Sequence, residues 1–221
     1  MHAFTSAFRP ILAAVVLGAA IVFAAQTTQA SPLELAFQTH AAFFSAESRQ
    51  PKVLDPHVFV ADAAAPAAIG PQGIKHVAGI RPAFVDQDGK SASVFTADNK
   101  PLGFTLGEWL GATGKVTIDG INPVQLSATF NGLKPHGHYS LFENHFDQKP
   151  IGFTPMDGTG KTNNFVAKAD GTATITMTLP HTPTHDNAVL LVYHSDDKDH
   201  SAERGAIGVD AHHQIIVRIP E

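Results

Sequence analysis

Two segments of the chain alternate apolar and polar residues with a period of two, and this pattern constrains the fold most. Over residues 124–130 the apolar Val, Leu, Ala and Phe alternate with Gln, Ser and Thr. Residues 172–179 repeat the alternation, with Thr at every second position. Successive side chains of a strand point to opposite faces, so the pattern predicts two strands with one buried and one solvated face.

The neighbouring sequence indicates further short strands separated by tight turns. Residues 188–193 (AVLLVY) are apolar throughout, which predicts a central strand covered on both faces, and residues 214–219 resemble a closing strand. Asp-Gly and Asn-Gly turn signals separate these segments at Asp119-Gly120, Asn131-Gly132, Asp157-Gly158 and Asp170-Gly171. We therefore predict an all-β fold, an antiparallel Ig-like or Greek-key sandwich.

Residues 31–90 lack this alternation and predict an N-terminal helix followed by an irregular segment. Ser31-Pro32-Leu33-Glu34 is typical of a capping box, and apolar residues then recur at helical spacing, which predicts a helix over residues 32–46. Residues 50–82 are rich in Ala, Pro and Gly and favour an irregular or extended connection. We place the main domain boundary near residue 90, with the sandwich domain over residues 91–221.

The first 30 residues have the composition of a signal peptide. A short start containing Arg9 leads into fifteen small or apolar residues over 11–25, and small residues follow at Thr28 and Ala30. Fifteen helical residues span about 22 Å, short of the ~30 Å hydrocarbon core of a membrane. We expect cleavage after Ala30, a periplasmic or secreted location, and no membrane span in the mature chain.

Charge and cysteine content exclude several classes of function. The chain has 15 Lys and Arg against 20 Asp and Glu, a net charge of −5, and no basic cluster, which argues against a nucleic-acid partner. It has no cysteine, which excludes thiolate catalysis, disulfides and cysteine-based zinc or iron–sulfur sites. The acidic stretch over residues 195–199 lacks the spacing of a calcium-binding EF-hand and favours a solvated loop.

Histidine is the unusual component of this chain. Nine of the 13 histidines lie between residues 136 and 213. Neutral imidazole is the best ligand for copper or zinc that a chain without cysteine offers. On an extended strand His136 and His138 would project from the same face, whereas the adjacent His212 and His213 would point to opposite sides.

These histidines lie in segments that a sandwich can bring together. Loops that join alternate strands gather at one end of a sandwich, so imidazoles from several loops can share one ion. The candidate metal ligands are His136, His138, His194, His200, His212 and His213. With an ordinary imidazole pKa of about 6.5, we expect metal binding to weaken between about pH 7 and pH 5. The alternative is that they are solvated loop residues.

Residues 124–147 resemble the strand–turn–strand segment of Cu,Zn superoxide dismutases. In that family a GL-x-P-type turn leads into a strand with an HxH pair and a further ligand histidine; here Gly132-Leu133-Lys134-Pro135 precedes His136-Gly137-His138. The resemblance implies a β-sandwich and copper or zinc as the metal. The HxH pair comes earlier after the turn, and the disulfide and the bridging-histidine and Asp pattern are missing, so the resemblance does not imply dismutase activity. The ending LVYHSD…GVDAHHQ resembles a group of secreted bacterial proteins.

Three functional hypotheses follow. The first is a periplasmic or secreted protein that binds copper or zinc for metal handling or for a metal-stabilised fold, which favours binding over catalysis. The second is a metal-free interaction or adhesion module whose loops bind another periplasmic or secreted protein or a glycan. The third is a dismutase-like metalloenzyme.

Overall fold

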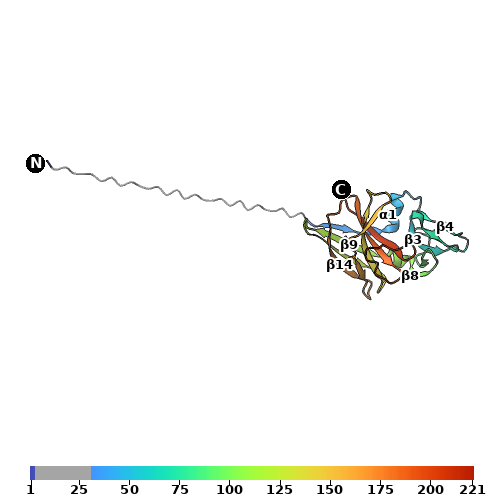
Figure 1. Ribbon diagram of the computed structural model, residues 1–221. Helices are drawn as coiled ribbons and strands as arrows, with labels where there is room; N and C mark the ends of the chain where they lie inside the picture. The colour runs from blue at the N-terminus through green and yellow to red at the C-terminus, as the bar shows by residue number, and fades with distance from the viewer. Residues whose placement is uncertain (3–30) are drawn as a thin grey trace.

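The structure, a computed structural model, describes residues 1–2 and 31–221, and its regular secondary structure is mainly β-strand (Figure 1). The predicted signal peptide, apart from Met1 and His2, lies outside the described residues. No helix in the described part of the chain has the length and apolar character needed to cross a membrane. Several antiparallel sheets and few helices confirm the predicted all-β, sandwich-like class.

One face of the sandwich is a four-stranded antiparallel sheet. Its order is β1 (Leu33–Ala36), β9 (Thr113–Asp119), β10 (Val124–Asn131) and β14 (Ala173–Leu179). The strands β10 and β14 are the two predicted from alternation. They pair directly, with buried and less buried residues alternating along both, so each has one face in the core.

The other face is a six-stranded sheet. Its path is β12 (Gly152–Pro155), β11 (His138–His145), β15 (Asn187–His194), β16 (Ala211–Arg218) and β2 (Gln38–Thr39), and β13 (Asn164–Val166) also pairs with β11. Every residue of β15 is buried, which confirms the central strand predicted over residues 188–193. The predicted closing strand is β16.

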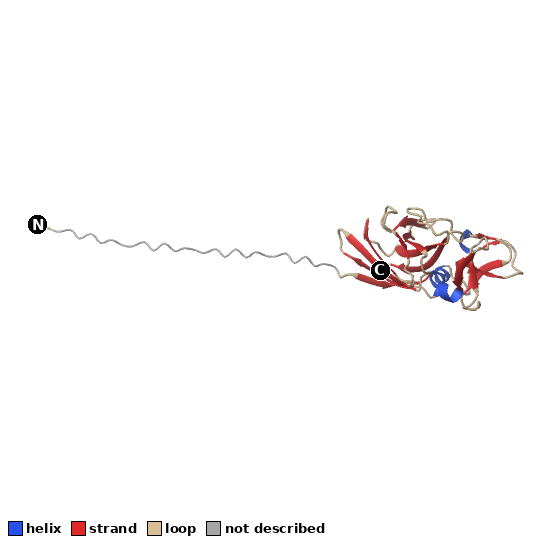
Figure 2. Ribbon diagram, turned by 90° about the horizontal axis from the view of Figure 1, so that it is seen from below, coloured by secondary structure: helices blue, strands red, loops and turns tan. Residues whose placement is uncertain are grey.

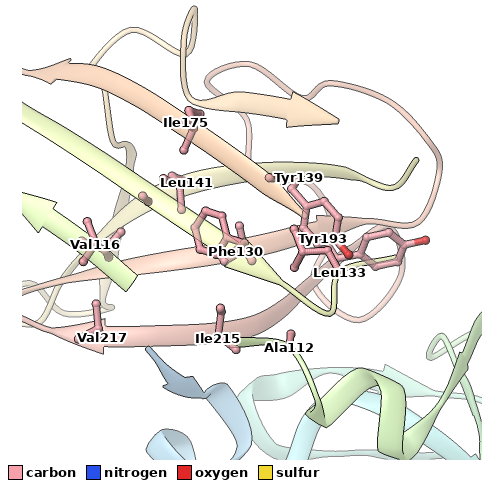
Figure 3. Close-up of a cluster of buried hydrophobic side chains, with 14 of the residues drawn as sticks. Ala112, Val116, Phe130, Leu133, Tyr139, Leu141, Ile175, Tyr193, Ile215 and Val217 are labelled. Carbon is pink, nitrogen blue, oxygen red and sulfur yellow. The ribbon is translucent and has the colours of Figure 1, made fainter. Parts of the chain in front are cut away.

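Side chains on both faces of the six-stranded sheet are covered. Between the two sheets, Phe130 of the first sheet packs in one cluster with Leu141 and Ile215 of the second, as Figure 3 shows. On the opposite face, Leu190 and the neighbouring apolar residues of the sheet pack against Phe43 of α1 (His40–Glu47). This double coverage explains why β15 is apolar at consecutive positions.

A third, smaller sheet lies beside the sandwich (Figure 2). It has the order β6 (Ile80–Phe84), β3 (Leu54–Ala61), β7 (Ser93–Phe95) and β8 (Pro101–Thr105). Next to it are the pair β4 (Ala68–Ile69) and β5 (Lys75–His76), the 3-10 turn η1 (Pro71–Gly73) and the helix α2 (Leu106–Leu110). The helix α1 contacts both β3 and β16, so it joins the small sheet to the sandwich.

The helix predicted over residues 32–46 is wrong in extent. Residues Leu33–Ala36 form the strand β1, which pairs with β9, and the helix begins only at His40, with Thr39 as its N-cap. Leu33, Leu35 and Phe37 pack against the main core. These three residues are also spaced by two, and pairing with the free edge of β9 decides in favour of the strand.

The segment predicted to be irregular, residues 50–82, contains a fully ordered strand. In β3 all residues except the last are buried, although the strand includes Asp55 and Pro56. The register of β3 with β6 shifts between Asp55 and Phe59, which is a bulge that accommodates the proline. Because β3 pairs with β7, the small sheet extends across residue 90, where we placed the domain boundary.

Candidate metal centre

Three histidines from distant parts of the chain meet where α1, β3 and β16 converge. His40 is the first residue of α1, His57 lies in β3 and His213 lies in β16. One ring nitrogen from each lies within 4.8 Å of the others, the geometry that one metal ion requires. All three residues are buried, with exposed fractions of 3% or less.

Irregular strand geometry positions two of the three rings. His57 lies within the irregular stretch of β3 between Asp55 and Phe59, where Asp55 Oδ1 accepts a hydrogen bond from the His57 backbone N–H at 2.8 Å. The register of β16 with β15 also shifts next to His213, which leaves Gln214 as the extra residue. Bulges commonly redirect a side chain near a functional site. Here both bulges lie beside a histidine of the cluster.

The imidazoles contact one another closely. The rings of His57 and His213 stack with centroids 4.0 Å apart, and the His40 ring lies edge-on to both, with centroids 4.9 Å away. The His40 Nε2 and His213 Nδ1 atoms are 3.4 Å apart. The three rings therefore form one compact group.

Gln72 fixes the protonation of one ring. Its Oε1 atom lies 2.7 Å from His57 Nε2, so the amide oxygen accepts a hydrogen bond from that nitrogen. The other ring nitrogen, His57 Nδ1, accepts a hydrogen bond from the His213 backbone N–H at 3.4 Å. Gln72 adopts a positive φ of 57°, an unfavourable conformation for a residue other than glycine. A partner that holds the second nitrogen of a histidine is a common feature around metal ligands.

Burial keeps these histidines neutral. It lowers the pKa of His40 to about 3, and burial together with the neighbouring imidazoles lowers the pKa of His57 and His213 well below 6.5. The expectation of proton competition between pH 7 and pH 5 assumed an ordinary imidazole and is too high for this cluster. At neutral pH each ring keeps one unprotonated nitrogen; in His57 this is Nδ1, and an ion bound there would replace the 3.4 Å hydrogen bond from the His213 backbone N–H.

The donor set of the cluster is compatible with a metal ion. The facing nitrogens are His40 Nε2 and His213 Nδ1, 3.4 Å apart. The opposite nitrogens of the same two rings, His40 Nδ1 and His213 Nε2, are buried without a hydrogen-bond partner among the described residues. A buried polar atom without a partner costs about 1–3 kcal/mol, so the two rings are held in place at a cost to the fold. Nitrogen-only ligation by three imidazoles suits zinc or copper and leaves a further coordination position open.

A second group consists of Asp196, His200 and Asp210, all half-buried. His200 Nε2 lies 3.0 Å from Asp196 Oδ1, and Asp210 Oδ1 accepts a hydrogen bond from the Ala206 backbone N–H at 2.5 Å. The potential ligand atoms of this group therefore already form hydrogen bonds within the protein. This second group can also offer a nitrogen and carboxylate oxygens to a metal.

The six histidines predicted as ligands are distributed over several environments. His213 belongs to the three-histidine cluster and His200 to the second group. His136 lies exposed in the turn before β11, with a positive φ of 60°. His138 Nδ1 is 3.0 Å from Asp199 Oδ1, in an ion pair at the surface.

The remaining two predicted ligands are buried and hydrogen-bonded elsewhere. His194 Nε2 lies 2.6 Å from Ser140 Oγ. His212 Nδ1 lies 2.9 Å from the backbone oxygen of His57, and its Nε2 is 3.1 Å from Ser195 Oγ. His212 therefore faces away from the three-histidine cluster, which confirms that it and His213 point to opposite sides.

Sequence reasoning missed His40 and His57. His40 is 173 residues from His213 along the chain, and neither is spaced from another histidine in a ligand pattern. Their shared property is complete burial at a junction of three elements, which appears only in the folded chain.

Comparisons with protein families, curated proteins and solved structures found no match to this chain. The fold and the cluster therefore define the class directly: an all-β sandwich protein with a buried three-histidine cluster able to hold a metal ion.

Proposed function

We propose that this protein binds one copper or zinc ion through His40, His57 and His213, in the periplasm or outside the cell. The observation that carries the proposal is three buried, neutral imidazoles from separate elements, each with one ring nitrogen within 4.8 Å of the others. The signal-peptide-like start of the chain supports the location.

The donor set supports the choice of metal. Imidazole suits zinc and copper, whereas magnesium and calcium prefer carboxylate and carbonyl oxygens, and this cluster contributes only nitrogen. Three imidazoles and one open position are typical of a zinc site that also admits an external ligand. The role that follows is metal handling or stabilisation of the fold by the metal.

The position of the cluster supports a structural contribution of the ion. His40, His57 and His213 come from α1, the small sheet and the six-stranded sheet. An ion held by all three would tie the small sheet to the sandwich, and binding energy gained only in the folded state is folding energy.

Elemental analysis of the tag-free chain over residues 31–221 tests the proposal. After exposure to copper or zinc and dialysis, we expect about one ion per chain, and His57→Ala and His213→Ala should each lose it. His76→Ala is the matched control, because His76 is also buried, in β5 next to the small sheet, but belongs to neither cluster. Absence of retained metal, or undiminished metal in both cluster variants, would overturn the proposal.

A further inference from the structure

A cavity of about 600 Å³ opens against the three-histidine cluster. His40 and His213 form part of its wall, and most of the rest is apolar, including Phe43, Phe146 and Phe153. Cavities of this size and character, with a few polar groups in an apolar lining, are typical of small-molecule sites.

The wall of this cavity contains one positively charged side chain, Arg204, and one carboxylate, Glu47. The guanidinium carbon of Arg204 lies 3.7 Å from the centre of the Phe153 ring. Its Nε atom is buried without a hydrogen-bond partner, and no carboxylate of the described residues forms an ion pair with it. The Arg204 side chain is half-buried, and burial lowers its pKa.

Arg218 does not line the cavity but stacks on Phe146, a ring of its wall, and shows what a fully paired arginine looks like there. Its guanidinium lies 4.6 Å from the centre of the Phe146 ring, but it donates to the His185 backbone oxygen at 3.0 Å and pairs with Glu47 at 3.5 Å. Two arginines therefore stack on rings that line the cavity, and of these two Arg204 is the one without an anionic partner.

We infer that the cavity binds a small organic carboxylate with an aromatic or similarly flat apolar body. The carboxylate would pair with Arg204, and the body would lie against the phenylalanine rings. A guanidinium stacked on a ring keeps its edge donors free, and these match the two oxygens of a carboxylate. The part of this inference that places the ligand beside a metal rests on the proposed function.

Benzoate is the probe that tests the inference, with benzyl alcohol as its neutral counterpart and acetate as the carboxylate without a ring. Binding to the metal-free and the zinc-treated chain is measured by isothermal titration calorimetry. We expect benzoate to bind about tenfold or more tightly than benzyl alcohol, which lacks the charge that pairs with Arg204, and more tightly than acetate, which lacks the ring that would lie against the phenylalanines.

Two arginine variants locate the charge. Arg204→Gln should weaken benzoate binding by about tenfold or more, whereas Arg218→Gln should leave it within about twofold. Arg204→Lys keeps the charge but not the planar fork, so it should fall between wild type and Arg204→Gln. This graded series, with melting curves for each variant, separates lost recognition from lost folding.

The outcomes distinguish this inference from the proposed metal site. Equal binding of benzoate and benzyl alcohol, no binding of benzoate, or undiminished binding by Arg204→Gln would each overturn the inference. A chain that retains metal but ignores benzoate refutes the inference alone. A chain that binds benzoate through Arg204 but retains no metal refutes the metal site alone and leaves the carboxylate pocket standing.

Discussion

The two groups of potential metal ligands differ in how the protein already uses them. His40, His57 and His213 are buried, contain only nitrogen donors and leave two ring nitrogens without a partner in the described chain. In the second group, Asp196 and His200 hydrogen-bond to each other at 3.0 Å and the residues are half-buried. The first group is incomplete without a further atom, whereas the second is satisfied by its own neighbours.

This difference shows that the density of a residue type along the chain is a poor guide to a site. The segment 136–213 holds nine histidines, yet it supplies only His213 to the three-histidine cluster. The sparse N-terminal part supplies the other two ligands. Burial and convergence of elements, and not spacing along the chain, distinguish the two groups.

The largest effect that we predict is the loss of stability of the metal-free protein at acidic pH, which tests whether its buried histidines are neutral. Burial lowers the pKa of His40 to about 3 and, more than any other cause, lowers those of His194 and His212 to about 4, from 6.5. A lowered folded-state pKa gives stability that is present above pH 6.5 and is lost as the pH falls toward the folded value. At ~1.4 kcal/mol per pKa unit, the loss is on the order of 10 kcal/mol, close to the whole stability of a typical domain.

We therefore expect the metal-free chain to unfold between about pH 6 and pH 4, as followed by circular dichroism and urea denaturation at each pH. His138→Ala is a suitable control, because His138 is a surface residue and should leave the acid transition in place. A free energy of unfolding that stays constant from pH 7 to pH 4 would contradict the neutral, buried state of these histidines.

Metal loading should give the next largest effect. At a free zinc concentration of about 100 times Kd, binding to the folded state alone adds about 2.7 kcal/mol, which corresponds to a rise in Tm of about 5–10 °C. Differential scanning calorimetry should show this rise for wild type and for His200→Ala, but not for His57→Ala. If His200→Ala abolishes the rise in Tm and His57→Ala retains it, the second group and not the three-histidine cluster binds the metal.

Replacing a ligand by an apolar residue should show how much the cluster lowers the stability of the metal-free chain. His40→Leu removes a buried nitrogen without a partner, so we expect the metal-free chain to become more stable by about 1 kcal/mol while metal retention is lost. Urea denaturation and elemental analysis of the same sample measure both quantities. A metal-free variant that is destabilised by several kcal/mol would mean that His40 already has a satisfactory environment.

The parts of the fold that the sequence predicts are those whose environment is local. Strands β10 and β14 alternate because each has one face in the core, and residues 188–193 of β15 are apolar at every position because both faces of the strand are covered. The opposite orientation of His212 and His213 follows from strand geometry alone. In each case a pattern of a few residues carries the whole signal.

The cluster could not be predicted in the same way because it depends on distant pairings. Leu33–Ala36 became a strand through its pairing with β9, and this fixed the helix start at His40. In β3, Pro56 interrupts the alternation and Asp55 is buried because Trp109 Nε1 donates to it at 2.7 Å. The positions of His40 and His57 therefore depend on partners that lie far away in the sequence.

The smallest predicted effect concerns the second group, where a substitution should change stability but not metal retention. Asp196→Asn removes the charge that faces His200 and keeps the size of the side chain, so we expect a loss of about 0.5–1.5 kcal/mol in the free energy of unfolding. Copper or zinc retention should remain at the wild-type level, because His40, His57 and His213 are unchanged. If Asp196→Asn instead releases the metal, the half-buried group is the true centre, and the three buried imidazoles are a core cluster that the fold stabilises without an ion.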